Sequence, residues 1–514
     1  MEMRNLIVCA DGTWNTPDQE DNGIPVPTNV VRLYNCLAHT DNKVNGQRKY
    51  YHPGVGTEGG IIDKLMGGGL GAGLGKNVMS AYRWLGSHYH PGDRIFLFGF
   101  SRGAYTVRSV GGMIGRCGML NLRGLPDKQI WGRVEKAYAD GYRNQENPED
   151  WASNWEFHQG DTPDGKVPIY FIGVWDTVGA LGIPDNLGLL NLLDNREDFV
   201  FHNTKLGNNV IHARHAVAID EKRASFAPTL WQEGDNTTDV KQVWFSGVHA
   251  DVGGGYAETG LSDLALKWMI DEAADSGLGF REKMVAQIET DNYRGVLHNS
   301  HKGIFSALQS RPRNIPKITE TNTTGIHSSV LNRSSNPPIA QAPYRPTREI
   351  RSGDDSVTIS VYADQPWNQT NIYLEKGVEY VFTAEGEWLD HNIPCDPDGR
   401  KENRFRSGEI LYFIGKWLGK AETLFRRITG NKQAEFTGTR RYEEYPWFAL
   451  IGVIAKSPPF PREKLSNPQY KHFYIGKEAT KTLEESGYFY CFANDAWNFY
   501  SNNHGRVQLT ITRN

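Results

Sequence analysis

Arg94-Ile-Phe-Leu-Phe-Gly-Phe-Ser101-Arg-Gly-Ala104 is the stretch of this 514-residue chain that decides its fold. The apolar run up to Phe98 predicts a buried strand, and the residues after Gly103 have the pattern of a helix. Between them lies the form G-x-S-x-G. A serine on such a sharp strand-to-helix turn has a strained backbone, and side chains two residues before or after it would collide. The context favours a nucleophilic serine over a turn that happens to contain one.

The residues on both sides of this turn, from 5 to 310, alternate short apolar runs with helical patterns. The predicted strands are Leu6–Ala10, Arg94–Gly99, Ile169–Trp175 and Val243–Gly247, and the predicted helices include Lys76–His88 and Ala104–Arg116. This alternation predicts an α/β domain, with a mostly parallel sheet flanked by helices. Polar residues end each run, at the carboxyl edge where a parallel sheet gathers its site.

Two later strands end on residues that can activate a serine. Asp176 follows Ile169–Trp175, and His249 follows Val243-Trp-Phe-Ser-Gly-Val248. A serine hydroxyl needs a histidine to take its proton and a carboxylate to orient that histidine. Serine, acid and histidine follow one another along the chain in the order that is usual after this type of turn. Ser101, Asp176 and His249 are therefore the predicted catalytic triad, although Asp176 could instead cap a helix.

Other residues near the predicted triad have supporting roles to fill. An oxyanion hole needs two backbone N–H groups, one of which should come from Arg102, the residue after the nucleophile. The loop after the first strand offers Gly12 and Thr13 for the other. Asp251 is a candidate for a supporting partner of His249 or for a cation ligand. His88 and His215 are interpreted as structural histidines.

A glycine-rich stretch, residues 67–76, invites a nucleotide-binding interpretation. Leu70 stands where a P-loop needs glycine, and Asn77 stands where it needs serine or threonine. A G-x-G-x-x-A match at 67–72 follows a helical run instead of a strand. The stretch is therefore expected to be a flexible loop, with an apolar flap over the site as the alternative.

The composition limits the compartment and the partners. A net charge of −4 gives no basic footprint for nucleic acid. Five cysteines without C-x-x-C spacing argue against a disulfide scaffold and a zinc site. The run Leu6–Ala10 is too short for a signal peptide, and no stretch reaches the roughly 18 apolar residues of a membrane span. We expect cytoplasmic synthesis without a signal peptide, and catalysis that requires no cofactor.

The C-terminal part of the sequence changes character at residue 311. Residues 311–350 are rich in proline and small polar residues and are expected to be a linker. Residues 351–514 contain short predicted strands without long helices between most of them, which predicts a β-sandwich. An insertion at about 407–435 places apolar side chains at helical spacing opposite basic ones. Packing on the protein itself is the expected role of that insertion, and docking on a membrane surface is the alternative.

Five ordered motifs within residues 3–300 resemble one family. They are Val8-Cys-Ala-Asp-Gly-Thr-Trp-Asn15, the turn at Ser101, Gly-Val-Trp-Asp176-Thr-Val-Gly, Ala-Arg-His215-Ala-Val-Ala-Ile-Asp-Glu, and Phe-Ser-Gly-Val-His249-Ala-Asp-Val-Gly-Gly. The pattern is similar to the α/β-hydrolase domain (domain of unknown function 2235) of family-one lipase effectors of bacterial type VI secretion. The resemblance implies a phospholipase with its triad at Ser101, Asp176 and His249.

The last residues resemble another family. Phe492-Ala-Asn-Asp495-Ala-Trp-Asn-Phe-Tyr-Ser-Asn502-Asn503-His-Gly505 is similar to the calcium-dependent galactose-binding bacterial lectin domain. Asp495, Asn502 and Asn503 carry hard oxygen atoms suited to Ca²⁺. Phe499 replaces a threonine of the lectin pattern that binds through its backbone, and the insertion could block the sugar site. A polar turn without metal is the alternative.

These observations predict a serine hydrolase that cleaves the carboxylic esters of phospholipids. The alternatives are an esterase acting on small or carbohydrate-linked esters, and a catalytically silent glycan-binding protein. The expected partners are a phospholipid membrane surface, a glycan, the secretion machinery and an immunity protein. Secretion into a target cell by a route that needs no signal peptide is the expected biology.

Overall fold

The computed structural model describes most of the chain. The described residues are 3–12, 19–21, 23–54, 70–144, 154–160, 162, 165–178, 206–232, 238–301, 310–320, 325–341, 344–353, 355–400, 441–455, 470–497 and 499–514. They fall into two compact units. The first contains the described residues up to 300 together with 325–341, and the second contains 301, 310–320 and the residues from 344 onward.

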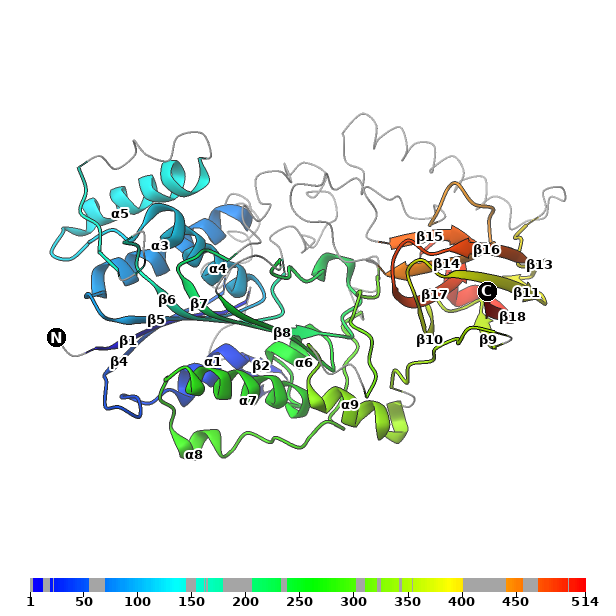
Figure 1. Cartoon of the computed structure of the whole chain (residues 1–514), viewed down its shortest axis with the longest axis horizontal. Coiled ribbons are helices and arrows are strands. Elements are labelled where there is room, and N and C mark those ends of the chain that lie inside the picture. Colours follow the sequence, from blue (N-terminus) through cyan, green and yellow to red (C-terminus); the bar gives the residue numbers. More distant parts are fainter. Residues whose placement is uncertain are drawn as a thin grey trace. The chain divides into compact units, whose positions relative to one another are not determined.

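A parallel sheet forms the centre of the first unit (Figure 1). Its described strands lie in the order β4-β1-β5-β6-β7-β8, and every neighbouring pair is parallel. Their bounds are β1 Asn5–Ala10, β4 Gln47–His52, β5 Arg94–Phe100, β6 Ile169–Trp175, β7 Val210–Ala218 and β8 Asp239–Phe245. The chain reverses its direction of progress across the sheet at β1, so the carboxyl ends of β1 and β5 flank a switch point. Such a point is where open α/β sheets form their sites.

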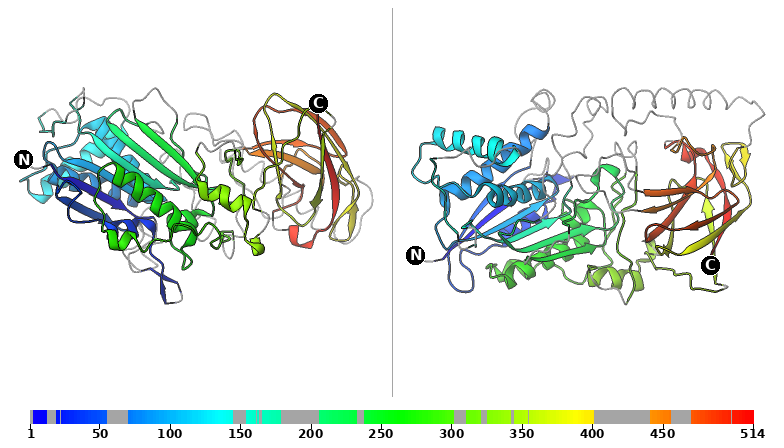
Figure 2. Two further views of the ribbon diagram at one scale, coloured as in Figure 1. Left: turned by 60° about the horizontal axis from the view of Figure 1, so that its bottom comes forward. Right: turned by 45° about the horizontal axis from the view of Figure 1, so that its top comes forward.

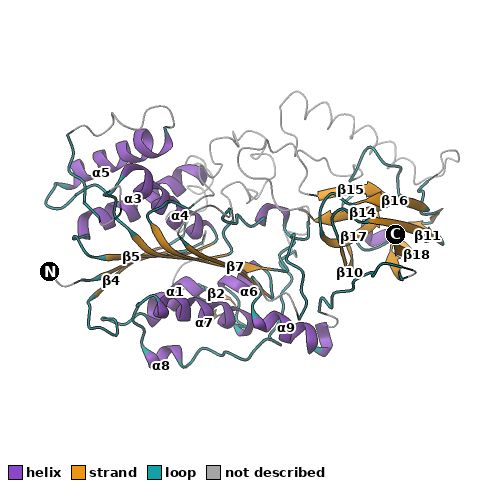
Figure 3. Ribbon diagram, in the orientation of Figure 1, coloured by secondary structure: helices purple, strands orange, loops and turns teal. Residues whose placement is uncertain are grey.

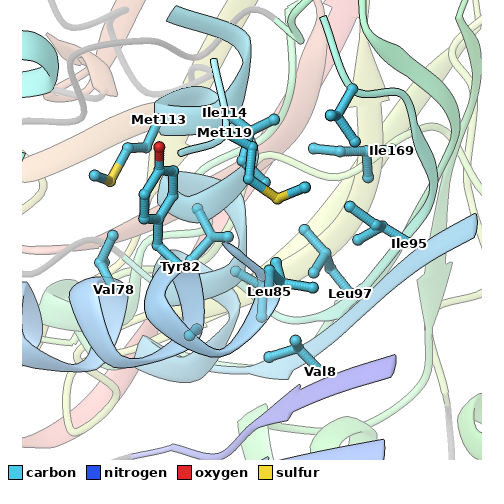
Figure 4. Packing of buried hydrophobic residues seen from close by; sticks show 14 of the residues in the cluster. Val8, Val78, Tyr82, Leu85, Ile95, Leu97, Met113, Ile114, Met119 and Ile169 are labelled. Atoms are coloured by element: carbon cyan, nitrogen blue, oxygen red, sulfur yellow. The ribbon is translucent and has the colours of Figure 1, made fainter. Parts of the chain in front are cut away.

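Helices cover both faces of this sheet (Figures 1 and 3). One face carries α3 Leu70–His88, α4 Arg102–Cys117 and α5 Asp127–Lys136; the other carries α1 Asn29–Cys36, α6 His249–Gly253, α7 Gly260–Asp275, and the shorter α8 Glu282–Val285 and α9 Ser328–Ser335. Successive strand residues point to opposite faces, so Ile95 and Leu97 pack under α3 and α4 (Figure 4), while Phe96 and Phe98 pack under α1 and α7. A short hairpin of β2 Glu20–Asp21 and β3 Ile24–Pro25 lies outside the sheet.

The α/β prediction for this unit is confirmed, with differences in the elements. Strands β4 and β7 were not among the predicted strands. Helix α3 begins at Leu70, earlier than the predicted Lys76. The second half of the glycine-rich stretch is therefore helical, and the prediction of a flexible loop is wrong for residues 70–76. Residues 67–69 lie outside the described part. No described helix has the length and hydropathy needed to cross a bilayer.

The second unit is built from two antiparallel sheets that pack face to face (Figure 2). One sheet has the order β10-β17-β14-β15, and the other has the order β13-β12-β18-β11-β16 with β9 also paired to β18. The strands are β9 Ser356–Tyr362, β10 Asn368–Leu374, β11 Glu379–Glu385, β12 Trp388–Asp390, β13 Ile393–Cys395, β14 Leu450–Ala455, β15 Tyr470–Tyr474, β16 Glu478–Thr482, β17 Gly487–Ala493 and β18 His504–Arg513. Their inner faces share one buried core, in which Phe382 of one sheet packs against Phe489 of the other. The β-rich C-terminal region is as predicted.

Residues 311–350 make specific contacts within each unit. In the first unit, Ile326 forms a parallel bridge with Trp244 of β8, and Arg333 of α9 is fully buried, donating to the carbonyls of Tyr293 and Gly295. In the second unit, the Ile318 N–H donates to the Tyr488 hydroxyl. The helical insertion predicted at about 407–435 falls on residues 401–440, outside the described residues.

Candidate active site

Ser101 occupies a strained turn between β5 and α4. Its φ is 56° and its ψ is −119°, a backbone conformation that non-glycine residues rarely adopt. A Cβ atom on Gly99 would lie 2.4 Å from the Gly103 carbonyl oxygen, and one on Gly103 would lie 2.1 Å from the Ala10 carbonyl oxygen. Both glycines of the G-x-S-x-G form are therefore sterically required. Residues 99–103 therefore form a tight strand-to-helix turn, the elbow, of the kind that carries a nucleophile in other proteins, and Ser101 in it is 5% exposed.

Asp176 ends the strand next to the one that carries Ser101. Phe100 pairs in register with Trp175, and the Ser101 N–H donates to the Trp175 carbonyl at 3.1 Å. Asp176 is fully buried, with φ at 35°. Its Oδ1 accepts a hydrogen bond from the Ala218 N–H at 3.0 Å. The carboxylate is thus aimed by the end of β7, and its second oxygen is left for another partner.

That partner is His249, the first residue of α6. The His249 Nδ1 lies 2.6 Å from Asp176 Oδ2. Because a carboxylate only accepts, Nδ1 carries the proton, and Nε2 of the neutral ring is the free base. Burial lowers the pKa of His249, and the hydrogen bond and charge of Asp176 oppose that effect. Two of the three predicted catalytic side chains are therefore in direct contact.

Aromatic rings fix the plane of this imidazole. The ring of Phe100, which directly precedes Ser101, lies 4.5 Å from the His249 ring between centroids, and Phe226 lies 4.9 Å away on an edge. Phe100 thus links the turn at Ser101 to the histidine. Within the described residues, the Ser101 hydroxyl makes no hydrogen bond to His249. Catalytic hydrogen bonds in unliganded sites are often long and tighten only with substrate.

The three residues predicted to donate to the oxyanion are not all placed alike by the structure. Arg102 is the first residue of α4 and follows Ser101 directly. The Gly12 N–H donates to the Asp11 carboxylate at 2.7 Å in this structure, while the other Asp11 oxygen accepts from Thr28 and Tyr51. Thr13 lies outside the described residues. The loop after β1 nevertheless lies against the elbow, because a Cβ on Gly103 would be 2.6 Å from the Asp11 carbonyl oxygen.

Two of the three predicted calcium ligands, Asp495 and Asn503, are in contact in the second unit, and Asn502 directly precedes Asn503 in the chain. Asp495 is 1% exposed, and its oxygens accept from the Ala496 N–H at 2.7 Å and from the Asn503 amide at 2.8 Å. Burial, with the nearby charge of Asp390, raises the pKa of Asp495 to about 7. The Oδ1 atoms of Asn502 and Asn503 are buried without a hydrogen-bond donor. Buried acceptors without donors next to a carboxylate fit a hard cation.

Several side chains around His249 were missed or only partly anticipated. Asp220 and Glu221 follow β7 and accept hydrogen bonds from the backbone at residues 247 and 249. Asp251, anticipated as a supporting partner, accepts from the Val248 N–H at 3.0 Å. The sequence signal was the Ile-Asp220-Glu221 that ends the motif around His215. His215 itself accepts a hydrogen bond from the Thr177 N–H at 3.1 Å, next to Asp176.

Comparisons with known proteins found a family model and a relative that match this chain. A family model described as the catalytic domain of Tle1-like phospholipase effectors of the type VI secretion system (T6SS) matches residues 4–272. An uncharacterized protein from Saccharomyces cerevisiae is 34% identical over 239 residues, which are 43% of this chain and 32% of the yeast protein. The chain therefore spans about a third of that relative's length.

Two solved structures have more distant similarity. An uncharacterized protein from Pseudomonas aeruginosa is 18% identical with a TM-score of 0.31, covering 62% of this chain and 57% of that one. The N-terminal domain of EclA, described as a PllA-like lectin, is 13% identical with a TM-score of 0.18, covering 30% of this chain and 95% of the lectin domain. The family match rests on more than half of the 514 residues, and the chain therefore belongs to the family of T6SS Tle1-like phospholipase effector catalytic domains.

Proposed function

We propose that this protein is a serine hydrolase that cleaves the carboxylic ester bonds of phospholipids. The observation that carries the proposal is the buried Asp176–His249 pair at 2.6 Å, at the carboxyl edge of the sheet where the strained Ser101 ends the neighbouring strand. Membership of a phospholipase effector family supports the substrate class.

Each member of the triad has one task in the proposed reaction. The Ser101 oxygen attacks the acyl carbonyl while His249 Nε2 takes the hydroxyl proton, and Asp176 stabilises the imidazolium that forms. The N–H of Arg102 donates to the developing oxyanion. His249 then gives its proton to the leaving alcohol. Water attacks the acyl-serine by the same route in reverse and releases the fatty acid. The chemistry needs no metal ion or cofactor in the first unit.

The test is lipid product analysis by mass spectrometry on phospholipid vesicles. We expect wild type to release fatty acid and lysophospholipid, and Ser101→Ala to release neither. Ser109→Ala is the matched control, because Ser109 is a buried serine in α4, the helix that follows Ser101. Vesicles left intact by a wild-type protein that turns over short-chain esters would identify a small-ester esterase. Equal activity of Ser101→Ala and wild type would exclude the serine mechanism.

We also propose a Ca²⁺ site in the second unit, made by Asp495, Asn502 and Asn503, with a glycan as its ligand. The two buried amide oxygens without donors support the cation, and the lectin-like sequence supports the glycan. The test is isothermal titration with CaCl₂, followed by galactose in the presence of Ca²⁺. Absence of calcium binding by wild type would refute the site.

The family also leads us to propose type VI secretion into a target cell, with the secretion machinery and an immunity protein as partners. The test is a co-culture of producing and target bacteria. We expect killing to require both Ser101 and a working secretion system in the producer. Killing that persists in Ser101→Ala would separate toxicity from the hydrolase.

A further inference from the structure

Three consecutive backbone amides leading into His249 are held by three different carboxylates. The Gly247 N–H donates to Asp220 Oδ2 at 2.8 Å, and the Val248 N–H donates to Asp251 Oδ2 at 3.0 Å. The N–H of His249 itself donates to Glu221 Oε2 at 3.2 Å. A hydrogen bond from an amide N–H to an ionised carboxylate is stronger than an ordinary backbone hydrogen bond. The backbone at His249 is thus held independently of the contacts that its ring makes.

These carboxylates are buried, so each needs compensation. Asp220, Glu221 and Asp251 are 8%, 1% and 2% exposed. The Arg223 guanidinium pairs with both oxygens of Glu221, at 2.9 and 2.8 Å. His298 Nδ1 lies 2.5 Å from Asp251 Oδ1. Burying an ionised carboxylate is strongly unfavourable unless it is paired. Structural packing alone would be served at lower cost by apolar side chains.

One segment contacts both members of the Asp–His pair. The Ala218 N–H at the end of β7 orients Asp176, and Glu221, three residues later, holds the backbone of His249. Arg223 continues the arrangement, because its guanidinium stacks on Phe226 at 3.5 Å from the ring centroid, and Phe226 packs against the His249 ring. The exit of β7 therefore sets the distance between acid and base.

We propose that Glu221, assisted by Asp220 and Asp251, is a positioning residue that holds His249 in register with Asp176 and Ser101. The inference rests on the proposed serine-hydrolase function and extends it beyond the triad.

A positioning role for the charged Glu221 predicts a change in the pKa of His249 that a packing role would not produce. The charged groups that act on the imidazole are Asp176 and Glu221, which raise the pKa of His249, and Arg223, which lowers it, while burial is the largest effect and lowers it. Replacing Glu221 with glutamine removes one negative charge and leaves Arg223 in place. The pKa of His249 must then fall, and the acid limb of any His249-dependent rate must move to lower pH.

The experiment measures the rate at which a fluorophosphonate probe labels Ser101, as a function of pH, in the full chain. We expect Glu221→Ala to reduce the maximal labelling rate roughly 10- to 100-fold, the range seen when the supporting partner of a metal-bound histidine is removed, with little change in the half-saturating probe concentration. Glu221→Gln keeps an acceptor for the His249 N–H, so it should retain more of the rate, with its acid limb at lower pH.

Asp93→Asn is the matched control, because Asp93 is a buried carboxylate paired with Arg4 at 2.5 Å just before β5, at the other end of the sheet. It should label like wild type. A wild-type rate and an unmoved acid limb in Glu221→Gln would overturn the positioning role, as would an equal loss in Asp93→Asn. Should Glu221→Ala fail to fold, the pH profile of Glu221→Gln still decides. Wild type that is not labelled at Ser101 overturns the hydrolase itself.

Discussion

At the scale of single residues, Gly103 bears the tightest constraint of the elbow. Any side chain there meets the Ala10 carbonyl oxygen at 2.1 Å, and backbone cannot move aside as a flexible side chain can. We expect Gly103→Ala to lower the free energy of unfolding by about 3 kcal/mol or more, and to abolish fluorophosphonate labelling. Urea denaturation measures the first and gel fluorescence the second.

Gly132 provides the matched control for that substitution. It lies inside α5, and a Cβ there meets nothing within 4 Å. Gly132→Ala should therefore leave labelling unchanged and stabilise the protein by about 0.5–1 kcal/mol, the helix preference of alanine over glycine. Equal stability of Gly103→Ala and wild type would show that the elbow is not as tight as its geometry requires.

The protonation of His249 predicts the pH dependence of hydrolysis. Its pKa lies below the ordinary value of 6.5 because burial outweighs the charge of Asp176. The neutral ring is the active base, so kcat/KM should rise with pH through this lowered pKa and be constant by neutral pH. A pH profile on a short-chain ester measures it. An acid limb centred above 6.5 would contradict the balance of charge and burial around the ring.

Much of the candidate site could be anticipated from sequence, for a physical reason. Ser101, Asp176 and His249 each directly follow or closely follow an apolar strand, and parallel strands bring their carboxyl ends together. The carboxylates Asp220 and Glu221 could not be assigned in this way. Their role depends on backbone amides 27 and 28 residues away, as the Gly247 and His249 bonds show, and no local pattern encodes which amide a carboxylate will meet.

At the scale of elements, strand β7 shows why some strands could not be predicted from the sequence. Strand β7, Val-Ile-His-Ala-Arg-His-Ala-Val-Ala, mixes charged residues into a run that is buried toward its end. Arg214 and His215 are compatible with burial because Glu272 and Asp239 pair with Arg214, and the Thr177 N–H donates to His215. Those partners come from other elements, so hydrophobic pattern alone could not identify the strand.

The short helix α6 is held by a titratable pair, which predicts how stability changes with pH. Burial alone would lower the pKa of His298, but its bonds to Asp251 and Glu258 outweigh burial and raise it. A raised pKa adds stability that is complete below the unfolded value of about 6.5 and is lost as pH rises through the folded value. The advantage of wild type over His298→Gln in urea denaturation should therefore be larger at pH 6 than at pH 9.

His158 supplies a control of opposite sign. Burial lowers its pKa, so the stability that it contributes is present at high pH and is lost as pH falls. The advantage of wild type over His158→Gln should accordingly grow from pH 5 to pH 8. Parallel pH trends for the two histidine variants would refute the assigned protonation of His298.

At the scale of the whole molecule, the pattern of apolar and polar residues predicted the class of each unit but not the contacts that the segment 311–350 makes. Proline and small polar residues in 311–350 predict a linker, and within that stretch Arg333 is fully buried in the first unit and Arg345 is 4% exposed in the second. Such segments pack through a few long side chains that bond to backbone carbonyls, as Arg333 does. A single arginine among polar residues leaves no periodic signal in the sequence.

The proposed calcium site predicts that the two units respond differently to one ligand. Asp495 has a pKa raised to about 7, so in the metal-free protein its ionisation costs stability as pH rises from its ordinary value of 3.8 to about 7. Calcium needs the ionised carboxylate and removes that cost. Millimolar CaCl₂ should therefore raise the melting temperature of the second unit, and by more at pH 8 than at pH 5.5. Calorimetry should resolve this transition from that of the first unit, which is expected not to move.

Magnesium, which prefers smaller octahedral sites, should have little effect, and Asp495→Asn should abolish the calcium shift while vesicle hydrolysis in detergent-free buffer continues. Equal calcium shifts at both pH values, or a shift that survives Asp495→Asn, would mean that the cation binds elsewhere.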